Sequence, residues 1–195
     1  MSQTSFQFEQ YQGISVLRLH SGDGTNRLTQ TCVVSLTETL HGLKRDECAL
    51  VIAGNSRFFS VGADLEEIAA LKGPAAYQFS RLGQGLMAAI ENFPAPVCAA
   101  ISGYCMGGGL DLALSCHRRI ASPNAIFGHR GAALGLITGW GGTQRLPRLI
   151  GKARALEMFV AAEKVSAAQA LRMGLINKIA EDPIAEACRC IRDIR

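Results

Sequence analysis

The sequence predicts an α/β fold with parallel strands. Short apolar runs alternate along the chain with longer stretches in which apolar residues recur at helical spacing. This alternation is typical of strands joined by crossover helices. Two of the runs, 49–53 (ALVIA) and 97–101 (VCAAI), are apolar throughout, as expected of strands buried on both faces of a sheet. Because 195 residues suffice for one sizeable core, we expect a single domain over 1–195 with its core at about 1–180.

The first half of the chain predicts a strand pair and two long helices. Residues 6–9 and 14–19 have the composition of two short strands joined by a Gln-Gly turn. Over 33–43, apolar residues recur at steps of three and four, which indicates an amphipathic helix. The same spacing over 79–93 predicts a second helix, and Pro94 ends it because proline cannot continue the backbone hydrogen-bond pattern.

The second half continues the alternation of helices and strands. Gly107 opens a helix that runs to about Cys116. The later predicted elements are a strand at 117–121, helices at 151–161 and 166–173, a strand at 175–179 and a short basic helix at 184–195. Ser166 is a suitable N-cap for the helix that it begins, and Gly174 is a suitable stop at its other end.

Charge and cysteine content exclude several classes of protein. The net charge of +4 is small and its residues are scattered, which argues against a nucleic-acid-binding protein. The seven cysteines form no Cys-x-x-Cys pair, and Cys188-x-Cys190 lacks a companion histidine, so we expect reduced thiols and no metal site. The first ten residues have no features of a secretory signal, and no apolar window is long enough to span a membrane. We therefore expect a cytoplasmic protein.

Two glycine-containing loops predict a site for an atom that carries negative charge. The first, 102–112 (SGYCMGGGLDL), places Gly107, Gly108 and Gly109 between a strand and a helix. The unpaired amides at a helix N-terminus attract negative charge, and glycine lets a ligand approach them closely. The second loop, 61–65 (VGADL), also leads from a strand into a helix. We expect both loops at the carboxyl ends of parallel strands, where one amide from each binds a single carbonyl oxygen.

Four segments together resemble the enoyl-CoA hydratase/isomerase family, also called the crotonase superfamily. In chain order they read FFSVGADLEEI, PVCAAISGYCMGGGLDLALSCHRRIAS, FGHRGAALGLITGWGGTQRLPRLIG and SAAQALRMGLINKI, and the resemblance covers about residues 14–180. It implies the ClpP/crotonase spiral of ββα turns and an acyl-CoA thioester as substrate, with no other cofactor. It also implies that the amides of Ala63 and Gly108 form an oxyanion hole, which agrees with the site expected from the two glycine loops.

The acid and base residues depart from the pattern of the family. The hydratases that this chain resembles use two glutamates, and Asp111 and Gly131 stand at the two positions. Asp111 is the expected acid or base, although a carboxylate in a first helical turn is also favoured by the helix dipole alone. His129 and Arg130 are close enough in sequence to replace the missing carboxylate, but the simpler interpretation is that His129 points away and fills a structural slot.

The resemblance also assigns residues around the CoA and acyl parts of the substrate. Residues 26–29 (NRLT) stand where relatives contact adenine and pantetheine, and Arg27 could compensate for a lysine that some relatives carry at the position of Glu66. Trp140 either lines the acyl pocket or belongs to the core. The expected substrate-binding residues are Arg27, Leu28, Ala63, Asp64, Leu65, Tyr104, Gly108 and Gly131.

The sequence therefore predicts an acyl-CoA enzyme that stabilises a thioester enolate. Addition of water needs two groups that exchange protons, so one carboxylate favours double-bond isomerisation or decarboxylation over hydration. The alternative is a catalytically silent homologue that binds acyl-CoA or forms oligomers. The resemblance implies a homo-oligomer, a trimer or a dimer of trimers. Relatives usually continue with further C-terminal helices, so we expect a shortened helical region and a more open pocket in a chain that stops at Arg195.

Overall fold

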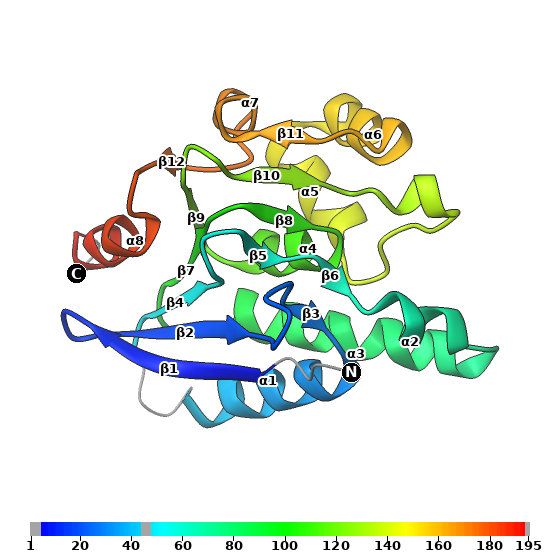
Figure 1. The fold of residues 1–195 in the computed structure, drawn as a ribbon, viewed down its shortest axis with the longest axis horizontal. Helices are drawn as coiled ribbons and strands as arrows, with labels where there is room; N and C mark the ends of the chain where they lie inside the picture. Colours follow the sequence, from blue (N-terminus) through cyan, green and yellow to red (C-terminus); the bar gives the residue numbers. More distant parts are fainter. Residues whose placement is uncertain (1–4, 44–47, 194–195) are drawn as a thin grey trace.

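The computed structural model describes residues 5–43 and 48–193. Two mainly parallel sheets and the helices around them make up the fold (Figure 1). The larger sheet has the strand order β1-β2-β4-β7-β9-β12. Its strands are β1 (Ser5–Tyr11), β2 (Ile14–His20), β4 (Leu50–Ala53), β7 (Val97–Ile101), β9 (Arg118–Ala121) and β12 (Lys178–Ile179). Only β1 is antiparallel to its neighbour. Every residue of β4 and β7 is buried, as the two apolar runs predict.

A smaller sheet with the order β11-β10-β8-β5 lies beside the first, and a two-stranded sheet pairs β3 with β6. The bounds are β5 (Phe58–Ser60), β8 (Tyr104–Met106), β10 (Ile126–Gly128) and β11 (Val165–Ser166), with β3 (Arg27–Leu28) and β6 (Gly62–Ala63). Strand β8 runs parallel to both β5 and β10, whereas β11 is antiparallel. These strands have two or three residues each, which is too short for a side-chain period to be visible in the sequence.

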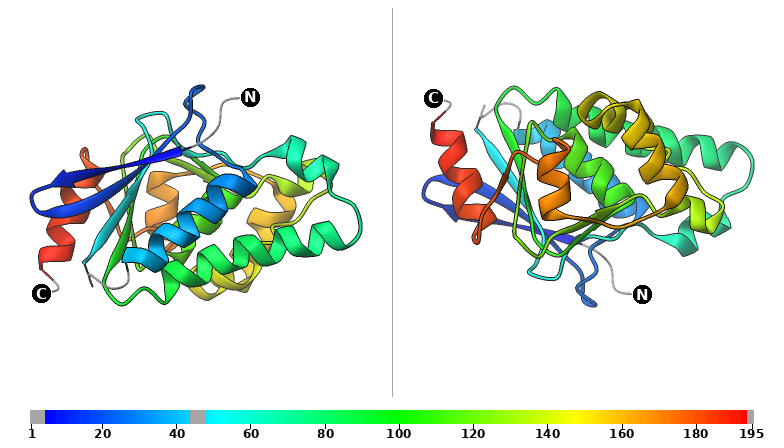
Figure 2. Two further views of the ribbon diagram at one scale, coloured as in Figure 1. Left: turned by 90° about the horizontal axis from the view of Figure 1, so that it is seen from below. Right: turned by 90° about the horizontal axis from the view of Figure 1, so that it is seen from above.

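The helices cover both faces of the larger sheet. They are α1 (Gln30–Leu43), α2 (Leu65–Ala70), α3 (Pro74–Glu91), α4 (Gly108–Ser115), the 3-10 helix η2 (Gly131–Leu134), α5 (Gly142–Ile150), α6 (Lys152–Ala161), α7 (Ala167–Arg172) and α8 (Pro183–Arg192). Figure 2 shows α8 on one side of the strands and the other helices on the opposite side. Helix α8 packs on β4, β7 and β9, and α1 packs on α3. None of the described helices is long and apolar enough to cross a membrane.

The chain repeats a unit of two strands and a helix. Strand β4 of the larger sheet leads to β5 of the smaller sheet and then to α2 and α3. Strands β7 and β8 lead in the same way to α4, and β9 and β10 lead to η2 and α5. Because β4, β7 and β9 are neighbours in one sheet and β5, β8 and β10 are neighbours in the other, successive units wind into a spiral. The predicted α/β class and the ββα spiral are confirmed.

The strands that lead into the glycine loops were not recognised in the sequence. β5 and β8 come between the predicted strands at 49–53 and 97–101 and the two loops. Gly103 makes the turn from β7 into β8 with φ +61°, and a Cβ there would overlap the backbone of Arg57. The two loops therefore begin at the carboxyl ends of parallel neighbours in the smaller sheet rather than the larger one.

Two other predicted boundaries differ from the structure. The strand expected at 175–179 is limited to β12, because the amides of Leu175 and Ile176 donate hydrogen bonds to the Ala170 carbonyl at the end of α7. The helix expected at 184–195 begins one residue earlier, where the Asp182 side chain accepts hydrogen bonds from the first turn. Residues 194–195 lie outside the described part of the chain.

Candidate active site

The two predicted amide donors, Ala63 and Gly108, lie beside each other. Gly62 has φ +93°, and a Cβ built on it would lie 2.7 Å from the Gly108 nitrogen. A Cβ built on Gly108 would lie 3.2 Å from the Ala63 nitrogen. The chain that joins β5 to α2 therefore passes directly against the start of α4, and this approach requires glycine at both positions.

Helix α4 directs its N-terminus toward the same place. Gly107 is the N-cap, with φ +52°, and its own amide donates to the Gly128 carbonyl at 2.9 Å. Gly108 is the first residue of the helix, where an amide has no acceptor within the helix. The dipole of α4 adds positive potential at this point. An acyl oxygen that gains negative charge is therefore favoured beside Gly108.

A cavity of about 1270 Å³ opens over the two amides. Its wall includes the start of α2, the start of α4 and the segment from His129 to Trp140. Leu65, Leu134 and Ile137 are more than half exposed at its edge. Apolar side chains deeper in the wall include Ile68, Leu71, Phe79 and Phe159. The cavity has both the apolar lining and the few polar groups that are typical of small-molecule sites.

Asp111 lies in the first turn of α4 and is completely buried. Its Oδ2 accepts a hydrogen bond from the Thr138 hydroxyl, and its Oδ1 lies 3.3 Å from His129 Nε2. A Cβ on Gly142 would overlap Oδ1, so α5 also packs closely against the carboxylate. The structure thus brings Asp111 into the cavity wall, but the segment that carries Thr138 covers it.

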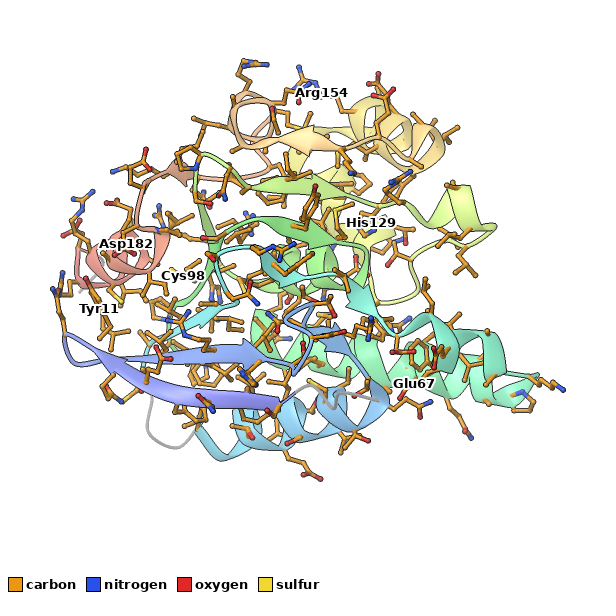
Figure 3. All side chains as sticks on the ribbon, viewed as in Figure 1. Tyr11, Glu67, Cys98, His129, Arg154 and Asp182 are labelled. Carbon is orange, nitrogen blue, oxygen red and sulfur yellow. The ribbon has the colours of Figure 1, made fainter. Side chains whose placement is uncertain are left out.

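His129 faces Asp111 instead of pointing away. It follows β10, is 4% exposed and packs against Phe159 with 5.1 Å between ring centroids. Figure 3 shows it beyond the end of β10, on the side of the molecule where α2 lies. The expectation that His129 could fill a slot away from the site was wrong. Arg130, the other substitute considered, also borders the cavity.

Trp140 belongs both to the core and to the cavity wall. It is 3% exposed, stacks on Phe79 at 5.2 Å, and donates from Nε1 to the Phe79 carbonyl at 3.2 Å. A Cβ on Gly108 would lie 2.6 Å from the ring, and a Cβ on Gly83 of α3 would overlap it. Because Gly83 and Gly108 have no side chains, the indole can pack against the start of α4. Trp140 is therefore a core residue and also part of the cavity wall.

Gly131 borders the cavity at the start of η2. A Cβ on Gly131 would lie 2.7 Å from the backbone oxygen of Leu136. The Leu136 amide also donates to the Gly131 carbonyl at 2.9 Å, which closes this turn of the chain. The local backbone is therefore fitted to a residue without a side chain, at the position where the resemblance to the family implies a glutamate.

Two residues expected to bind substrate lie elsewhere. The Leu28 side chain is fully buried in the core, because β3 turns it inward from the paired strands β3 and β6. The Tyr104 ring stacks on Phe58 at 5.7 Å and lies under the ammonium group of Lys164 at 5.1 Å. Neither side chain is part of the cavity wall, so substrate binding by Leu28 and Tyr104 stays a prediction.

The remaining predicted residues do border the cavity. Asp64 caps α2 by accepting from the Glu66 and Glu67 amides, and Leu65 follows it. Arg27 borders the same space and pairs with Asp23 at 2.9 Å. Backbone and side-chain donors around Asp23, led by the Thr25 amide, lower the pKa of its carboxyl to about 2.

Buried Arg119 fixes the far end of α4. Its Nη1 donates to the Cys116 carbonyl at 2.7 Å, and its Nε donates to the Leu175 carbonyl at 2.8 Å. Burial lowers the pKa of this guanidinium. Burial also raises the pKa of the nearby Cys98 and Cys116 thiols to about 12. These cysteines are core residues, and no group of metal-ligating side chains occurs in the described part of the chain.

Sequence reasoning did not identify Thr138, Phe159 or Gly142 as parts of the site. Thr138 lies in an irregular segment with no motif of its own, and Phe159 is an ordinary apolar residue of α6. Only the folded chain shows that both contact the Asp111–His129 pair.

Comparison with known proteins identifies the family. The sequence model for enoyl-CoA hydratase/isomerase matches residues 9–191. The chain belongs to the enoyl-CoA hydratase/isomerase family. Its sequence is 41% identical over 174 residues to a probable enoyl-CoA hydratase of Bacillus subtilis, and 34% identical over 176 residues to a crotonyl-CoA hydratase of Syntrophomonas wolfei. These alignments cover 88% and 89% of the chain, and 67% and 68% of the two relatives.

The fold agrees with solved structures of the family. The structure of Pseudomonas aeruginosa DspI superposes with a TM-score of 0.91 at 32% identity, over 97% of this chain and 74% of that protein. With the family and its fold shown, the chain is an enzyme of the enoyl-CoA hydratase/isomerase type, and the family's substrates are acyl-CoA thioesters.

Proposed function

We propose that the protein binds an acyl-CoA thioester and stabilises its enolate with the amides of Ala63 and Gly108. The position of both nitrogens beside one another at the start of α4, under a largely apolar cavity, carries this proposal. Removal of a proton from the carbon next to a thioester places negative charge on the thioester oxygen. Two fixed donors stabilise that charge, and each contributes about 3 kcal/mol.

Asp111 is the proton-transfer group in this proposal. It takes a proton from the α carbon of a 3-enoyl thioester, and the electron pair of that bond moves onto the thioester oxygen. Asp111 then returns the proton to the γ carbon as the enolate collapses, which gives the 2-enoyl thioester. Because the carboxylate is covered, the segment that carries Thr138 has to shift when substrate binds.

A single carboxylate favours this proton shift over addition of water. Gly131 supplies no second acid or base, and its backbone leaves no room for a side chain. Loss of CO2 from an acyl-CoA is also compatible with the site, since it depends mainly on stabilisation of the enolate. Arg27 contributes positive charge toward the polyanionic CoA, no further cofactor is required, and assembly into a homo-oligomer remains part of the proposal.

The test uses the purified chain with short and medium 2-enoyl-CoA and 3-enoyl-CoA, followed by thioester absorbance. Conversion of 3-enoyl-CoA, lost at least 100-fold in Asp111→Asn, supports the proposal. Asp193→Asn is the matched control, because Asp193 is exposed at the end of α8. CoA binding without turnover of any substrate instead supports a catalytically silent homologue, which Gly131 favours.

A further inference from the structure

Asp111 and His129 contact each other through two buried polar atoms that lack hydrogen-bond partners among the described residues. Oδ1 and Nε2 are 3.3 Å apart, yet neither atom has an aligned hydrogen-bond partner in the described part of the chain. Asp111 is 0% exposed and His129 is 4% exposed. A buried polar atom without a partner costs about 1 to 3 kcal/mol, and more when it is charged. Two such atoms that face each other are placed to form a hydrogen bond after a small change of angle.

The surroundings of the carboxylate leave His129 as the second donor. Thr138 occupies Oδ2, and the close approach of Gly142 brings a Cα rather than a donor side chain to Oδ1. Asp111 also lies in the first turn of α4, where the helix dipole favours a negative charge. An ionised carboxylate that is fully buried requires hydrogen bonds to its oxygens. Among the described side chains, the imidazole is the donor that lies at Oδ1.

The imidazole is held in place for this contact. Phe159 packs against one part of the ring, with centroids 5.1 Å apart and planes at 47°. On another side, a Cβ on Gly142 would lie 3.0 Å from Nε2, which shows how closely α5 approaches. A small rotation of the ring or the carboxylate converts the 3.3 Å contact into an aligned hydrogen bond.

We propose that His129 is a positioning residue for Asp111. Its Nε2–H donates to Asp111 Oδ1 and fixes the direction from which the carboxylate reaches the substrate. This inference rests on the proposed function, in which Asp111 moves the proton. His129 exchanges no atom with the substrate. It organises the site through a hydrogen bond, in a chain whose Gly131 supplies no second carboxylate.

A spectroscopic measurement tests the hydrogen bond without turnover. In protein labelled with ¹⁵N-histidine, His129→Gln assigns the His129 signals among the four histidines. We expect the proton of His129 on Nε2 in the unsubstituted chain and a loss of this fixed tautomer in Asp111→Ala. A proton on Nδ1, or an identical tautomer pattern in Asp111→Ala, would overturn the proposal.

A kinetic series tests the positioning role. In His129→Gln, the amide nitrogen stands near the place of Nε2 and still donates, whereas His129→Leu has no donor. We expect His129→Leu to lower kcat about 10- to 100-fold, as the loss of a hydrogen bond to a charged group does, with KM unchanged. We expect His129→Gln to keep most of kcat. His20→Gln, at an exposed histidine, is the control.

The possible results separate this inference from the proposed function. Equal activity in His129→Leu and the unsubstituted chain overturns the inference, and so does an equally large loss in His129→Gln and His129→Leu. Absence of turnover in the unsubstituted chain overturns the proposed function instead, while the ¹⁵N measurement still decides whether His129 donates to Asp111.

Discussion

Gly108→Ala tests whether the start of α4 binds the reacting oxygen. The new methyl group would lie 2.6 Å from Trp140 Cζ3, whereas ordinary contacts begin at 3.4 Å, so one of the two has to move by about 0.8 Å. The ring cannot retreat, because α3 approaches it closely at Gly83. The Gly108 amide therefore moves away from its position beside Ala63.

The expected loss of activity follows from this displacement. A misplacement of about 1 Å costs on the order of 100-fold in rate, and loss of one oxyanion donor costs about 100- to 1000-fold. We therefore expect kcat/KM to fall by about 100- to 1000-fold, which corresponds to about 3 to 4 kcal/mol. Overpacking should also lower the free energy of unfolding by about 1 to 3 kcal/mol. Steady-state kinetics and urea denaturation measure the two effects.

Two further variants isolate the cause. Gly85→Ala makes the same change on α3 with no atom within 4 Å of the new methyl group, so it should keep full activity and gain about 0.5 to 1 kcal/mol of stability. Gly108→Ala combined with Trp140→Phe removes the ring atoms that collide and should recover part of the activity. Gly108→Ala with unchanged kcat/KM and normal CoA binding would refute the reasoning.

The remaining predictions concern the missing second acid or base at Gly131, the C-terminal end of α4 and the stability of the fold at low pH. Gly131→Glu should not produce efficient hydration, because its Cβ would lie 2.7 Å from the Leu136 backbone oxygen; a hydration assay checks this. Arg119→Met should lower the free energy of unfolding by about 3 kcal/mol in urea denaturation, since buried carbonyl groups lose their donor. Hydrogen bonds from Arg189 of the same helix and from Lys178 lower the pKa of the Glu186 carboxyl to about 2. Its contribution to stability is complete above pH 4.5 and is lost toward pH 2, and Glu186→Gln should reduce this loss in acid unfolding measured at low salt.

The long elements were predictable because their patterns are strong. Buried strands such as β4 and β7 are apolar throughout, and α3 shows a clear helical period that Pro94 ends. Strands β5, β8 and β10 have three residues each, so their sequence carries no period, and the strands that lead into the glycine loops were not predicted for this reason. Hydrogen-bond pairing between distant segments defines these strands, and such pairing is not a property of any local stretch.

The site was predictable where backbone chemistry decides it and not where side chains meet. Gly62 and Gly108 show that two segments approach closely, and both lie where the motifs placed them. The sequence did not show that Tyr104 packs against Phe58 or that His129 faces Asp111. Those orientations depend on which side of β8 and β10 each side chain occupies, and a strand that cannot be recognised in the sequence has no predictable faces.

Because α4 is attached at both ends, the site should keep its geometry until the whole fold unfolds on heating. Arg119 ties the C-terminal turn of α4 to the chain after α7, and Gly107 ties the N-terminal turn to β10. A segment clamped in this way opens only when the surrounding layers open with it. Amides along α4 should therefore exchange with deuterium as slowly as the core strands do, and warming should abolish thioester binding and global order at the same temperature.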